Sequence, residues 1–241
     1  MESVFIVIPT YNERETIKQL LIGIFSLPIQ NLHVLVVDDN SPDKTGELVE
    51  VLCLVNPNLE VLHRKEKNGL GPAYVAGFRY CLQQGAELIV QMDADLSHDP
   101  AAVPTLIAAS KSADLVLGSR YINGGRVVNW GVGRRLISRF GNRYARLVLG
   151  LPYHDLTGGF KCYRRAILEK IGLDRLSSVG YNFQIETTYF AHRQGARIVE
   201  APITFTERAA GRSKFSLKII IESFWKVLRL RLDSRHATKN N

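Results

Sequence analysis

The chain has 241 residues, of which 46% are hydrophobic and 22% are charged, a globular composition that excludes a disordered protein. Its three cysteines, Cys53, Cys81 and Cys162, form no CxxC pair, which excludes a disulfide framework or a zinc ribbon and is typical of a reducing compartment. The formal net charge of +8 favours anionic partners such as nucleic acid, acidic lipid or phosphorylated substrates.

The first half of the chain alternates strand and helix patterns. The expected strands are Ser3–Pro9, Leu32–Val37, Leu59–His63, Leu88–Met92 and Asp114–Gly118; helices are expected at Glu13–Phe25, after a cap at Ser41 or Asp43, at Gly69–Gln84 and from Pro100. Strands separated by single helices predict right-handed crossovers and a parallel sheet. Because the chain enters its first strand almost at once, we expect no secretory signal.

One uncharged stretch, Gln19–Val37, is long enough to cross a bilayer. It has Pro28, Gln30, Asn31 and His33 in its middle, so we interpret it as a helix end, a loop and a strand. We therefore expect no transmembrane helix.

The second half is less regular. Here the patterns predict helices at Arg134–Leu149, Phe183–Gln194 and Lys214–Leu232, and strands at Gly158–Tyr163 and at Ile198–Thr206, the latter broken by Pro202. No change of composition marks a linker. We predict one α/β domain over residues 1–213, an amphipathic helix over 214–232 and a frayed tail over 233–241.

Polar residues follow four of the expected strands. In a parallel sheet the carboxyl ends of the strands meet at one edge, where ligands bind. The sequence therefore predicts a site at that edge, built from Thr10-Tyr11-Asn12-Glu13, Asp38-Asp39, Asp93-Ala94-Asp95 and Ser119-Arg120.

Asp93-Ala94-Asp95 is the most informative of these groups. Two neighbouring carboxylates repel each other unless a cation or hydrogen-bond donors compensate, and Mg²⁺ or Mn²⁺ takes such oxygens while sharing its other positions with substrate phosphates. The alternative is that Asp95 or Asp99 only caps the helix after Pro100. The chain lacks a P-loop, a GxGxxG turn and a GxSxG elbow, which disfavours Walker-type ATP hydrolysis, a standard dinucleotide fold and serine hydrolysis.

Short motifs follow one another along most of the chain. They are IPTYNE at 8–13, VVDDNSPDKT at 36–45, MDADLSH at 92–98, GSRY at 118–121, GGRVVNW at 124–130, RRLISR at 134–139, DLTGGFK at 155–161, GYNFQIE at 180–186 and ERAAGRSK at 207–214. Taken together, these motifs resemble the dolichol-phosphate mannose synthase group of family 2 glycosyltransferases. The resemblance runs from Ile6 to about Lys214 and depends on the order of the set, since each motif alone is weak.

The resemblance implies a single GT-A type, Rossmann-like domain with a mostly parallel central sheet, and a donor site for GDP-mannose. It implies that the nucleobase and ribose lie at the first two strand ends and that two cations cover the donor diphosphate. The implied donor-binding residues are Pro9, Tyr11, Glu13, Asp39, Ala94, Asp95 and Arg120, with Arg208 and Lys214 as the cationic lid. Taken singly, Tyr11 and Glu13 could equally serve packing and the helix N-terminus, and the two cations could equally belong to an exposed basic loop.

The resemblance also implies that Asp93 and Asp95 hold Mg²⁺ or Mn²⁺ and, with Arg120, form the catalytic centre. Relatives in this group often carry Gln two residues after the second Asp. This chain has Ser97 at that position, which we place with the metal ligands.

Arg120, Arg134 and Ser138 resemble a cradle for the phosphate of a polyprenyl or dolichyl phosphate acceptor. Arginine suits this role because its planar fork binds phosphate with two hydrogen bonds and stays protonated. The alternative for Arg134 is a solvated basic face, since further arginines crowd the same helix, and some of those could meet lipid head groups. Glu186 is expected either to act near the acceptor or to orient Arg and Lys side chains.

A phosphate acceptor simplifies the chemistry. A phosphate monoester is largely dianionic at neutral pH, so it attacks the anomeric carbon directly, with inversion, and needs no general base. Three alternatives remain open: transfer of glucose or another sugar from a UDP-sugar, a catalytically inactive nucleotide-sugar-binding subunit, and a basic nucleic-acid-binding module. The last lacks an RRM, KH or helix-turn-helix pattern, so we expect no nucleic-acid partner.

The expected helix over Lys214–Leu232 has one polar, mostly basic stripe opposite Trp and Phe side chains. Such a helix suits the surface of an anionic membrane, and packing on the protein's own core is the alternative. We expect a cytoplasmic protein held peripherally at the cytoplasmic face of a membrane, alone or with a separate membrane-anchoring partner protein.

Overall fold

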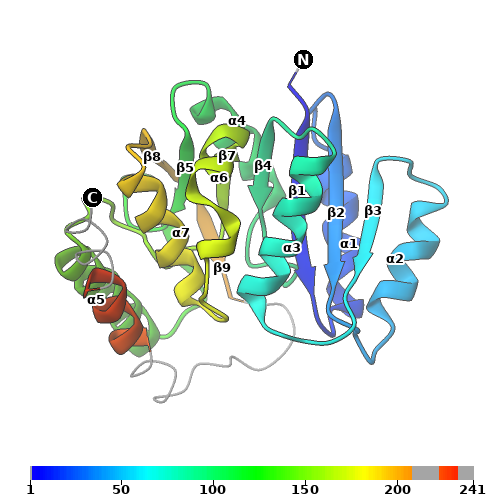
Figure 1. The fold of residues 1–241 in the computed structure, drawn as a ribbon. Helices are drawn as coiled ribbons and strands as arrows, with labels where there is room; N and C mark the ends of the chain where they lie inside the picture. Colours follow the sequence, from blue (N-terminus) through cyan, green and yellow to red (C-terminus); the bar gives the residue numbers. More distant parts are fainter. Residues whose placement is uncertain (1, 208–222, 233–241) are drawn as a thin grey trace.

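The computed structural model describes residues 2–207 and 223–232 (Figure 1). The large sheet contains β1 (Val4–Thr10), β2 (Leu32–Asp38), β3 (Leu59–His63), β4 (Leu88–Gln91), β5 (Leu115–Ser119), β7 (Lys161–Arg164) and β8 (Ile198–Pro202), and the small sheet contains β6 (Arg126–Val128) and β9 (Thr204–Thr206). The helices are α1 (Arg14–Phe25), α2 (Thr45–Cys53), α3 (Leu70–Gln83), α4 (Val103–Ser110), α5 (Val132–Leu149), α6 (Arg165–Ile171) and α7 (Asn182–Arg193), with short 3-10 turns at Pro100–Ala102 and Leu173–Arg175.

The large sheet has the strand order β3-β2-β1-β4-β7-β5-β8. β1 pairs in parallel with both β2 and β4, as the crossover pattern predicts. β7 is antiparallel to both of its neighbours, β4 and β5, so the sheet is mostly but not entirely parallel. The predicted α/β class is confirmed.

Two predicted strands of the second half need correction. The strand expected at Gly158–Tyr163 begins only at Lys161, because Gly158 and Gly159 lie in irregular chain, where Gly159 passes close to Asp93. The strand expected at Ile198–Thr206 is two strands in two sheets, and Ile203 separates them. Pro202 ends β8. The chain then leaves the large sheet, and β9 pairs with β6 in the small one.

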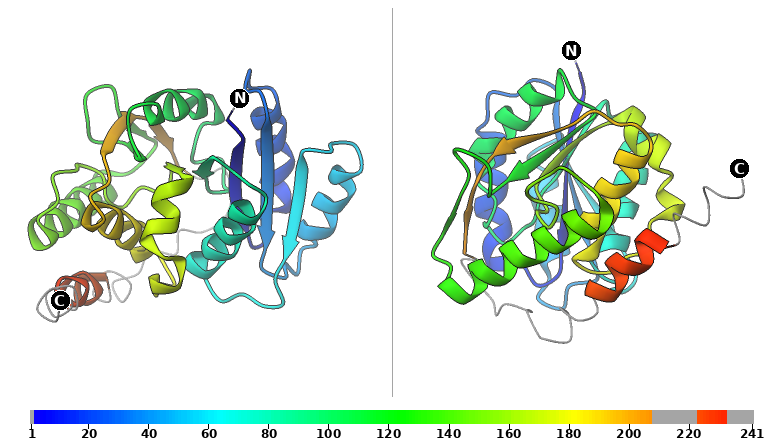
Figure 2. Two further views of the ribbon diagram at one scale, coloured as in Figure 1. Left: turned by 45° about the horizontal axis from the view of Figure 1, so that its top comes forward. Right: turned by 90° about the vertical axis from the view of Figure 1, so that its left-hand side faces the viewer.

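Helices cover both faces of the large sheet (Figures 1 and 2). One buried cluster joins the sheet to α1, α2 and α4, and a second joins it to α3, α6 and α7. The continuous apolar strands have a burial pattern with almost every residue inside, as expected for a sheet covered on both sides. The carboxyl ends of β1, β2 and β4 point to the lower edge in Figure 1, and this arrangement gathers the polar loop residues there.

A third buried cluster lies at one end of the molecule, where α5 meets α7 and the helical segment 223–232. The hydroxyl of Tyr144 donates to the carbonyl of Phe224 (3.1 Å), and their rings lie 4.1 Å apart. Val227 is buried in this cluster, so the described end of the predicted C-terminal helix does pack on the protein. Residues 208–222 and 233–241 lie outside the described chain, so the predicted domain boundaries stay predictions.

Among the described helices, none has the length and the apolar character needed to cross a membrane. The uncharged stretch Gln19–Val37 is the end of α1, a loop and most of β2, as predicted.

Candidate functional site

Asp93 and Asp95 lie just beyond the carboxyl end of β4, and a hydroxyl group orients each carboxylate. Tyr74 on α3 donates to Asp93 Oδ1 (2.7 Å). Ser97 donates to Asp95 Oδ1 from both its hydroxyl (2.5 Å) and its backbone N–H (3.1 Å). Leu96 between them has a positive φ of 60°, a conformation that is unfavourable for a branched residue and here turns Ser97 back onto Asp95.

A nearby aspartate tests the helix-cap alternative. Asp99 Oδ1 accepts from the N–H of Ala101 (2.9 Å) and so caps the turn that begins at Pro100. Asp95 is buried and bonded within its own loop instead. Capping therefore accounts for Asp99 and leaves the diacidic pair to another purpose.

The diacidic pair fits a small hard cation. Both residues offer carboxylate oxygens, the ligands that Mg²⁺ and Mn²⁺ prefer, and a cation that keeps water and substrate phosphate needs only one or two of them. No group of three or more His, Cys, Asp or Glu side chains suited to a metal occurs in residues 2–207 and 223–232, so a self-contained protein cage is not formed there. A Cβ at Gly159 would lie 3.2 Å from Asp93 Oδ2, so only glycine fits without a tight contact on that oxygen.

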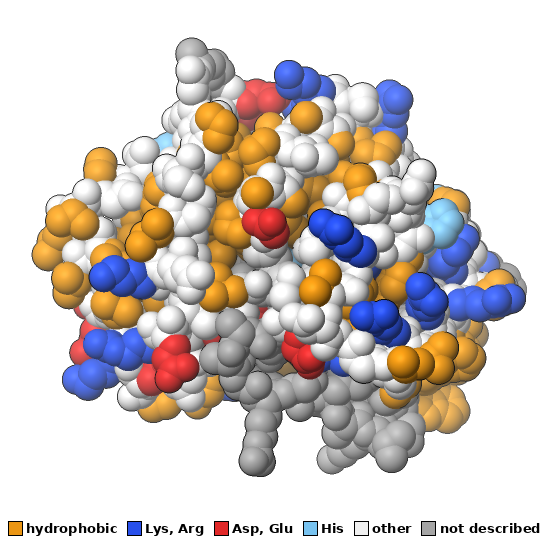
Figure 3. Space-filling model, turned by 180° about the vertical axis from the view of Figure 1, so that it is seen from behind, with side chains coloured by type: hydrophobic (Ala, Val, Ile, Leu, Met, Phe, Trp, Pro, Cys, Tyr) orange, Lys and Arg blue, Asp and Glu red, His pale blue; other side chains and the backbone are white. Residues whose placement is uncertain are grey.

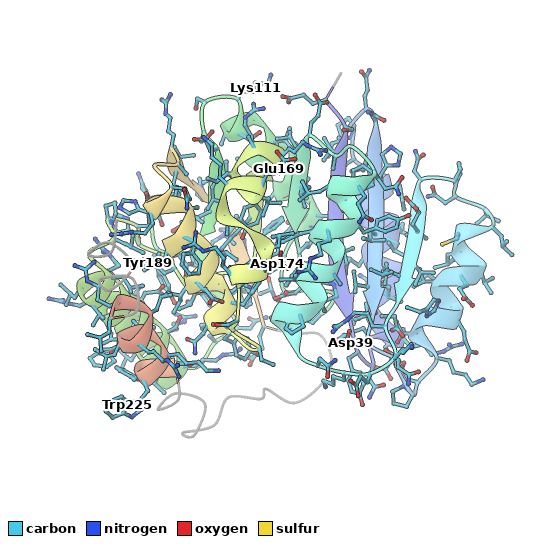
Figure 4. All side chains as sticks on the ribbon, viewed as in Figure 1. Asp39, Lys111, Glu169, Asp174, Tyr189 and Trp225 are labelled. Carbon is cyan, nitrogen blue, oxygen red and sulfur yellow. The ribbon has the colours of Figure 1, made fainter. Side chains whose placement is uncertain are left out.

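The structure distinguishes Asp38 from Asp39. Asp38 holds the loop together, because its carboxylate accepts from the hydroxyls of Thr10 (2.9 Å) and Ser41 (2.6 Å). Asp39 lies beyond the end of β2 (Figure 4) and accepts from Arg64 Nη1 at 2.6 Å. Burial raises the pKa of Asp39, and Arg64 offsets this only in part. Of the two, Asp39 is the carboxylate that borders a binding edge.

Tyr11 and Glu13 lie at the same edge, after β1. The ammonium of Lys67 lies 3.5 Å from the centre of the Tyr11 ring, and Glu13 Oε2 accepts from Thr16 at 3.2 Å. Pro9 is half-buried in β1, and Ala94 is buried between the two aspartates. The sequence interpretation missed Lys67 and Arg64, because the loop after β3 carries no motif; its run of cations was the only available signal.

Arg120 is buried and paired with Asp155, a residue whose role the sequence did not suggest. Its Nε and Nη2 reach the two carboxylate oxygens at 2.7 and 2.8 Å, and Nη2 also reaches Thr157 at 2.8 Å. Burial alone would raise the pKa of Asp155, but the charge and hydrogen bonds of Arg120 outweigh it, so that pKa is lowered. The guanidinium is therefore held rigidly at the end of β5.

Arg134 and Ser138 lie on α5, facing Arg120. Arg134 pairs with Glu207 (2.8 Å) and stacks on Trp130, with its central carbon 4.1 Å from the ring centre. The Tyr121 hydroxyl donates to Ser138 Oγ at 2.7 Å.

A single cavity of about 170 Å³ brings much of this together. Its wall contains the residues predicted for the metal and for the acceptor phosphate: Asp93, Asp95, Ser97, Arg120, Arg134 and Ser138. The far wall is largely apolar and comes from α5 and segment 223–232, with Phe140, Tyr144, Phe224 and Val227. Pro9, Tyr11, Glu13 and Asp39 lie outside this wall, at the neighbouring strand ends. The predicted lid residues Arg208 and Lys214 fall outside the described residues.

The contacts that the structure describes for Glu186 are structural. It is buried, and its carboxylate accepts from the N–H groups of Ser177 (3.2 Å) and Ser178 (2.9 Å) and from the Ser177 hydroxyl. It therefore fixes the loop before α7, and its expected roles near the acceptor or beside Arg and Lys side chains stay predictions. An acidic residue inside an otherwise buried helix face was the signal for such a structural role.

Known proteins resemble this chain closely. An undecaprenyl-phosphate mannosyltransferase of Micrococcus luteus is 46% identical over 232 residues, covering 96% of this chain and 95% of that protein. A polyprenol monophosphomannose synthase of Mycolicibacterium smegmatis is 47% identical over 234 residues, covering 95% and 88%. A mannosyltransferase of Pyrobaculum calidifontis, solved in complex with GDP-Man and Mn²⁺, shares the fold with a TM-score of 0.63 at 21% identity, covering 94% and 64%.

The sequence pattern of glycosyl transferase family 2 matches residues 5–172. With two relatives above 45% identity over nearly the whole chain, the protein belongs to this family of glycosyltransferases. The predicted GT-A type fold and the predicted family are confirmed.

Proposed function

We propose that this glycosyltransferase moves mannose from GDP-mannose to the phosphate of a polyprenyl or dolichyl-type lipid, with inversion, at an anionic membrane surface. One observation carries the proposal. A single cavity joins a diacidic pair, two arginines and an apolar wall, and these suit in turn a metal-bound diphosphate, a phosphate and an isoprenoid chain. The names of the two close bacterial relatives, a mannosyltransferase and a mannose synthase of polyprenyl phosphates, support the same substrates.

The donor lies along the carboxyl ends of β1, β2 and β4. Asp39 and Glu13 offer carboxylates to base and ribose donors, and Tyr11 with Pro9 offers an apolar surface. Lys67 and Arg64 add positive charge at the same edge. Arg208 and Lys214 complete the donor side as a cationic lid in this proposal.

Asp93 and Asp95 hold Mg²⁺ or Mn²⁺, which when bound neutralises the charge that develops on the leaving diphosphate. Tyr74 and Ser97 donate to these carboxylates and restrict their rotation, as partners of metal ligands commonly do. A solved relative of the same fold holds Mn²⁺ together with GDP-Man.

The acceptor phosphate lies between Arg120 and Arg134, near Ser138. Its oxygen attacks the anomeric carbon from the side opposite the leaving group; the new bond joins that oxygen to mannose while the bond to GDP breaks. The phosphate arrives largely as a dianion, so no proton has to be removed. Arg120, held by Asp155, supplies a fixed positive charge beside the reacting phosphate.

The lipid leaves the cavity along its apolar wall, toward a surface of α5 and segment 223–232 that we call the lipid face. It consists of the exposed apolar residues Leu136, Phe140, Leu147 and Trp225 and the basic residues Arg135, Arg139, Arg143 and Arg146 of α5. Leu147 is 74% and Trp225 69% exposed, and Trp225 points away from the protein body (Figure 4). Figure 3 shows Lys and Arg side chains gathered beside exposed apolar ones in the region of α5. Apolar side chains flanked by cations suit anionic lipid, at the cytoplasmic face of a membrane and with or without an anchoring partner.

Transfer of radiolabelled mannose from GDP-mannose to polyprenyl phosphate tests the proposal. We expect an organic-soluble, acid-labile product with Mg²⁺ or Mn²⁺ and none with EDTA. Product from UDP-glucose but not from GDP-mannose would keep the mechanism and replace the sugar. No product from any nucleotide sugar would overturn the proposal.

A further inference from the structure

Three buried N–H groups of the cavity wall have no hydrogen-bond partner: His98 Nε2, Trp130 Nε1 and Arg134 Nε. In residues 2–207 and 223–232 these are the only buried side-chain nitrogen or oxygen atoms in this condition, and all three belong to this one cavity. A buried donor without an acceptor is costly, and folded proteins contain few of them. Three unsatisfied donors and no unsatisfied acceptor among the described residues of this wall indicate a ligand that is rich in acceptor oxygens.

The three side chains form one arrangement around Phe205. His98 and Trp130 both meet the Phe205 ring edge-on, with centroids 5.3 Å away in each case. Arg120 stands 5.2 Å from the centre of the same ring and 5.5 Å from that of Trp130, and Arg134 stacks on Trp130. The neutral donors His98 and Trp130 thus lie in the same group of side chains as the two arginines assigned to the acceptor phosphate.

The hydrogen bonding of His98 fixes which of its nitrogens carries the proton. His98 Nδ1 accepts from the backbone N–H of Asp93 at 3.2 Å, so the proton of the neutral ring is on Nε2. The ring is held between Phe160 and Phe205 and is 1% exposed. Trp130 is 8% exposed and its indole nitrogen can only donate.

We propose that His98 Nε2–H and Trp130 Nε1–H donate hydrogen bonds to the acceptor phosphate, alongside Arg120 and Arg134. This rests on the proposed function, which it deepens by naming two neutral donors. A phosphate monoester presents three terminal oxygens with several lone pairs, so four donors around it can all be satisfied at once. The acceptor phosphate is favoured over the donor diphosphate because Trp130 lies just before α5 and stacks with Arg134, one of the two arginines assigned to that phosphate.

Substitutions can remove each donor with little change of shape. Trp130→Phe keeps an aromatic ring against Phe205 and loses the N–H. His98→Asn keeps an acceptor for the Asp93 N–H and loses the outer donor, whereas His98→Gln places an amide N–H near the position of Nε2. A hydrogen bond to a charged group predicts that Trp130→Phe and His98→Asn each raise the KM for polyprenyl phosphate about 10- to 100-fold. The KM for GDP-mannose should stay unchanged, and His98→Gln should recover much of the loss.

A binding measurement separates this inference from the transfer reaction. Trp130 and Trp225 are the two tryptophans of the chain, so Trp225→Phe leaves Trp130 as the fluorescent reporter. Farnesyl phosphate should change its emission, and farnesol, which lacks the phosphate, should not. In the same chain, His98→Asn should weaken farnesyl phosphate binding by the same factor as it raises the KM.

Several results would overturn the inference. Unchanged acceptor KM values in folded Trp130→Phe and His98→Asn proteins would mean that neither N–H meets the phosphate. A raised KM for GDP-mannose instead would assign the two donors to the diphosphate. Tight farnesyl phosphate binding that depends on the His98 donor, without any sugar transfer, would keep this inference and remove the proposed function.

Discussion

Helices α2 and α5 lie at opposite ends of the molecule (Figure 1). Both ends expose apolar side chains. At the end of α2, Leu54 and Val55 are more than 80% exposed, but the helix before them carries Glu47 and Glu50. On α5 the exposed apolar residues alternate with the four arginines of the lipid face. Exposed apolar side chains alone therefore do not show which end meets a membrane. The neighbouring charges distinguish the two ends, because acidic residues repel an anionic membrane, whereas basic residues attract it.

The interior of the two ends differs as well. Near α2, the carboxylates of Asp38 and Asp39 are bonded to neighbouring loops, so this edge is formed before any ligand binds. Near α5, the cavity wall keeps three N–H groups without acceptors. In the proposed function, the donor side is therefore held by bonds within the protein, and the acceptor side is completed by its lipid.

The largest effect on transfer activity is expected at Asp95, in the diacidic pair between the proposed donor and acceptor sides. Asp95→Asn should lower kcat/KM about 1,000-fold, as loss of a group that stabilises developing charge does. Steady-state mannose transfer at saturating Mn²⁺ measures it. Asp99→Asn is the matched control: it removes a helix cap and should leave transfer almost intact. Equal losses in both variants would return the diacidic pair to a structural role.

The second-largest effect is expected from breaking the ion pair that holds Arg120 on the acceptor side. Asp155→Asn leaves Arg120 buried without its partner, which is expected to cost about 3–5 kcal/mol of unfolding free energy at pH 7. Urea unfolding measures the loss. The pKa of Asp155 is lowered by Arg120, so its contribution is present above the ordinary carboxylate pKa and disappears as the pH falls through the lowered value.

Asp174 provides the control for that change. It pairs with Arg79 but is exposed (Figure 4), so Asp174→Asn should cost at most about 1 kcal/mol. A similar small cost for Asp155→Asn would show that Arg120 is not held by this pair.

The charge comparison between α2 and α5 can be tested with vesicles. Leu136→Asp with Phe140→Asp should weaken binding to vesicles containing anionic lipid about 10- to 100-fold, because each change removes roughly 1.5–3 kcal/mol of apolar transfer at most. Flotation with phosphatidylglycerol vesicles measures it. Leu54→Asp with Val55→Asp should leave binding unchanged. Equal binding by the wild type and the two double variants would contradict the proposed lipid face.

The smallest effect concerns the buried Lys161 and the pH dependence of the unfolding free energy. Lys161 in β7 is fully buried and donates to the Gln184 carbonyl and to the hydroxyls of Thr187 and Thr188 on α7. Burial lowers its pKa to about 7. Between that pH and the ordinary lysine value the unfolded chain binds more protons, so stability rises with pH.

The difference in unfolding free energy between the wild type and Lys161→Met should therefore change in favour of the wild type by roughly 1 kcal/mol per pH unit above pH 7. Urea unfolding at pH 7 and pH 9 measures it. Parallel pH profiles for the two proteins would show that Lys161 keeps its ordinary proton affinity.

The amino-acid sequence by itself determined the parallel half of the sheet. Apolar strands and the helices between them have short sequence periods, which predict each element from its own residues. The position of the acidic pair at the site edge could be predicted because it directly follows the β4 strand pattern. The family could also be recognised from the sequence, because an ordered set of short motifs survives without any knowledge of contacts.

Only the tertiary structure decided which side chains meet. Arg120 and Asp155 are 35 residues apart, and their pairing depends on β7 entering the sheet antiparallel between β4 and β5. The same holds for Glu186 of α7, which bonds the loop before that helix, and for His98 and Trp130 around Phe205. A local pattern records which face of an element is buried; the partner of a polar group on that face depends on strand order, register and distance, which no short stretch of sequence contains.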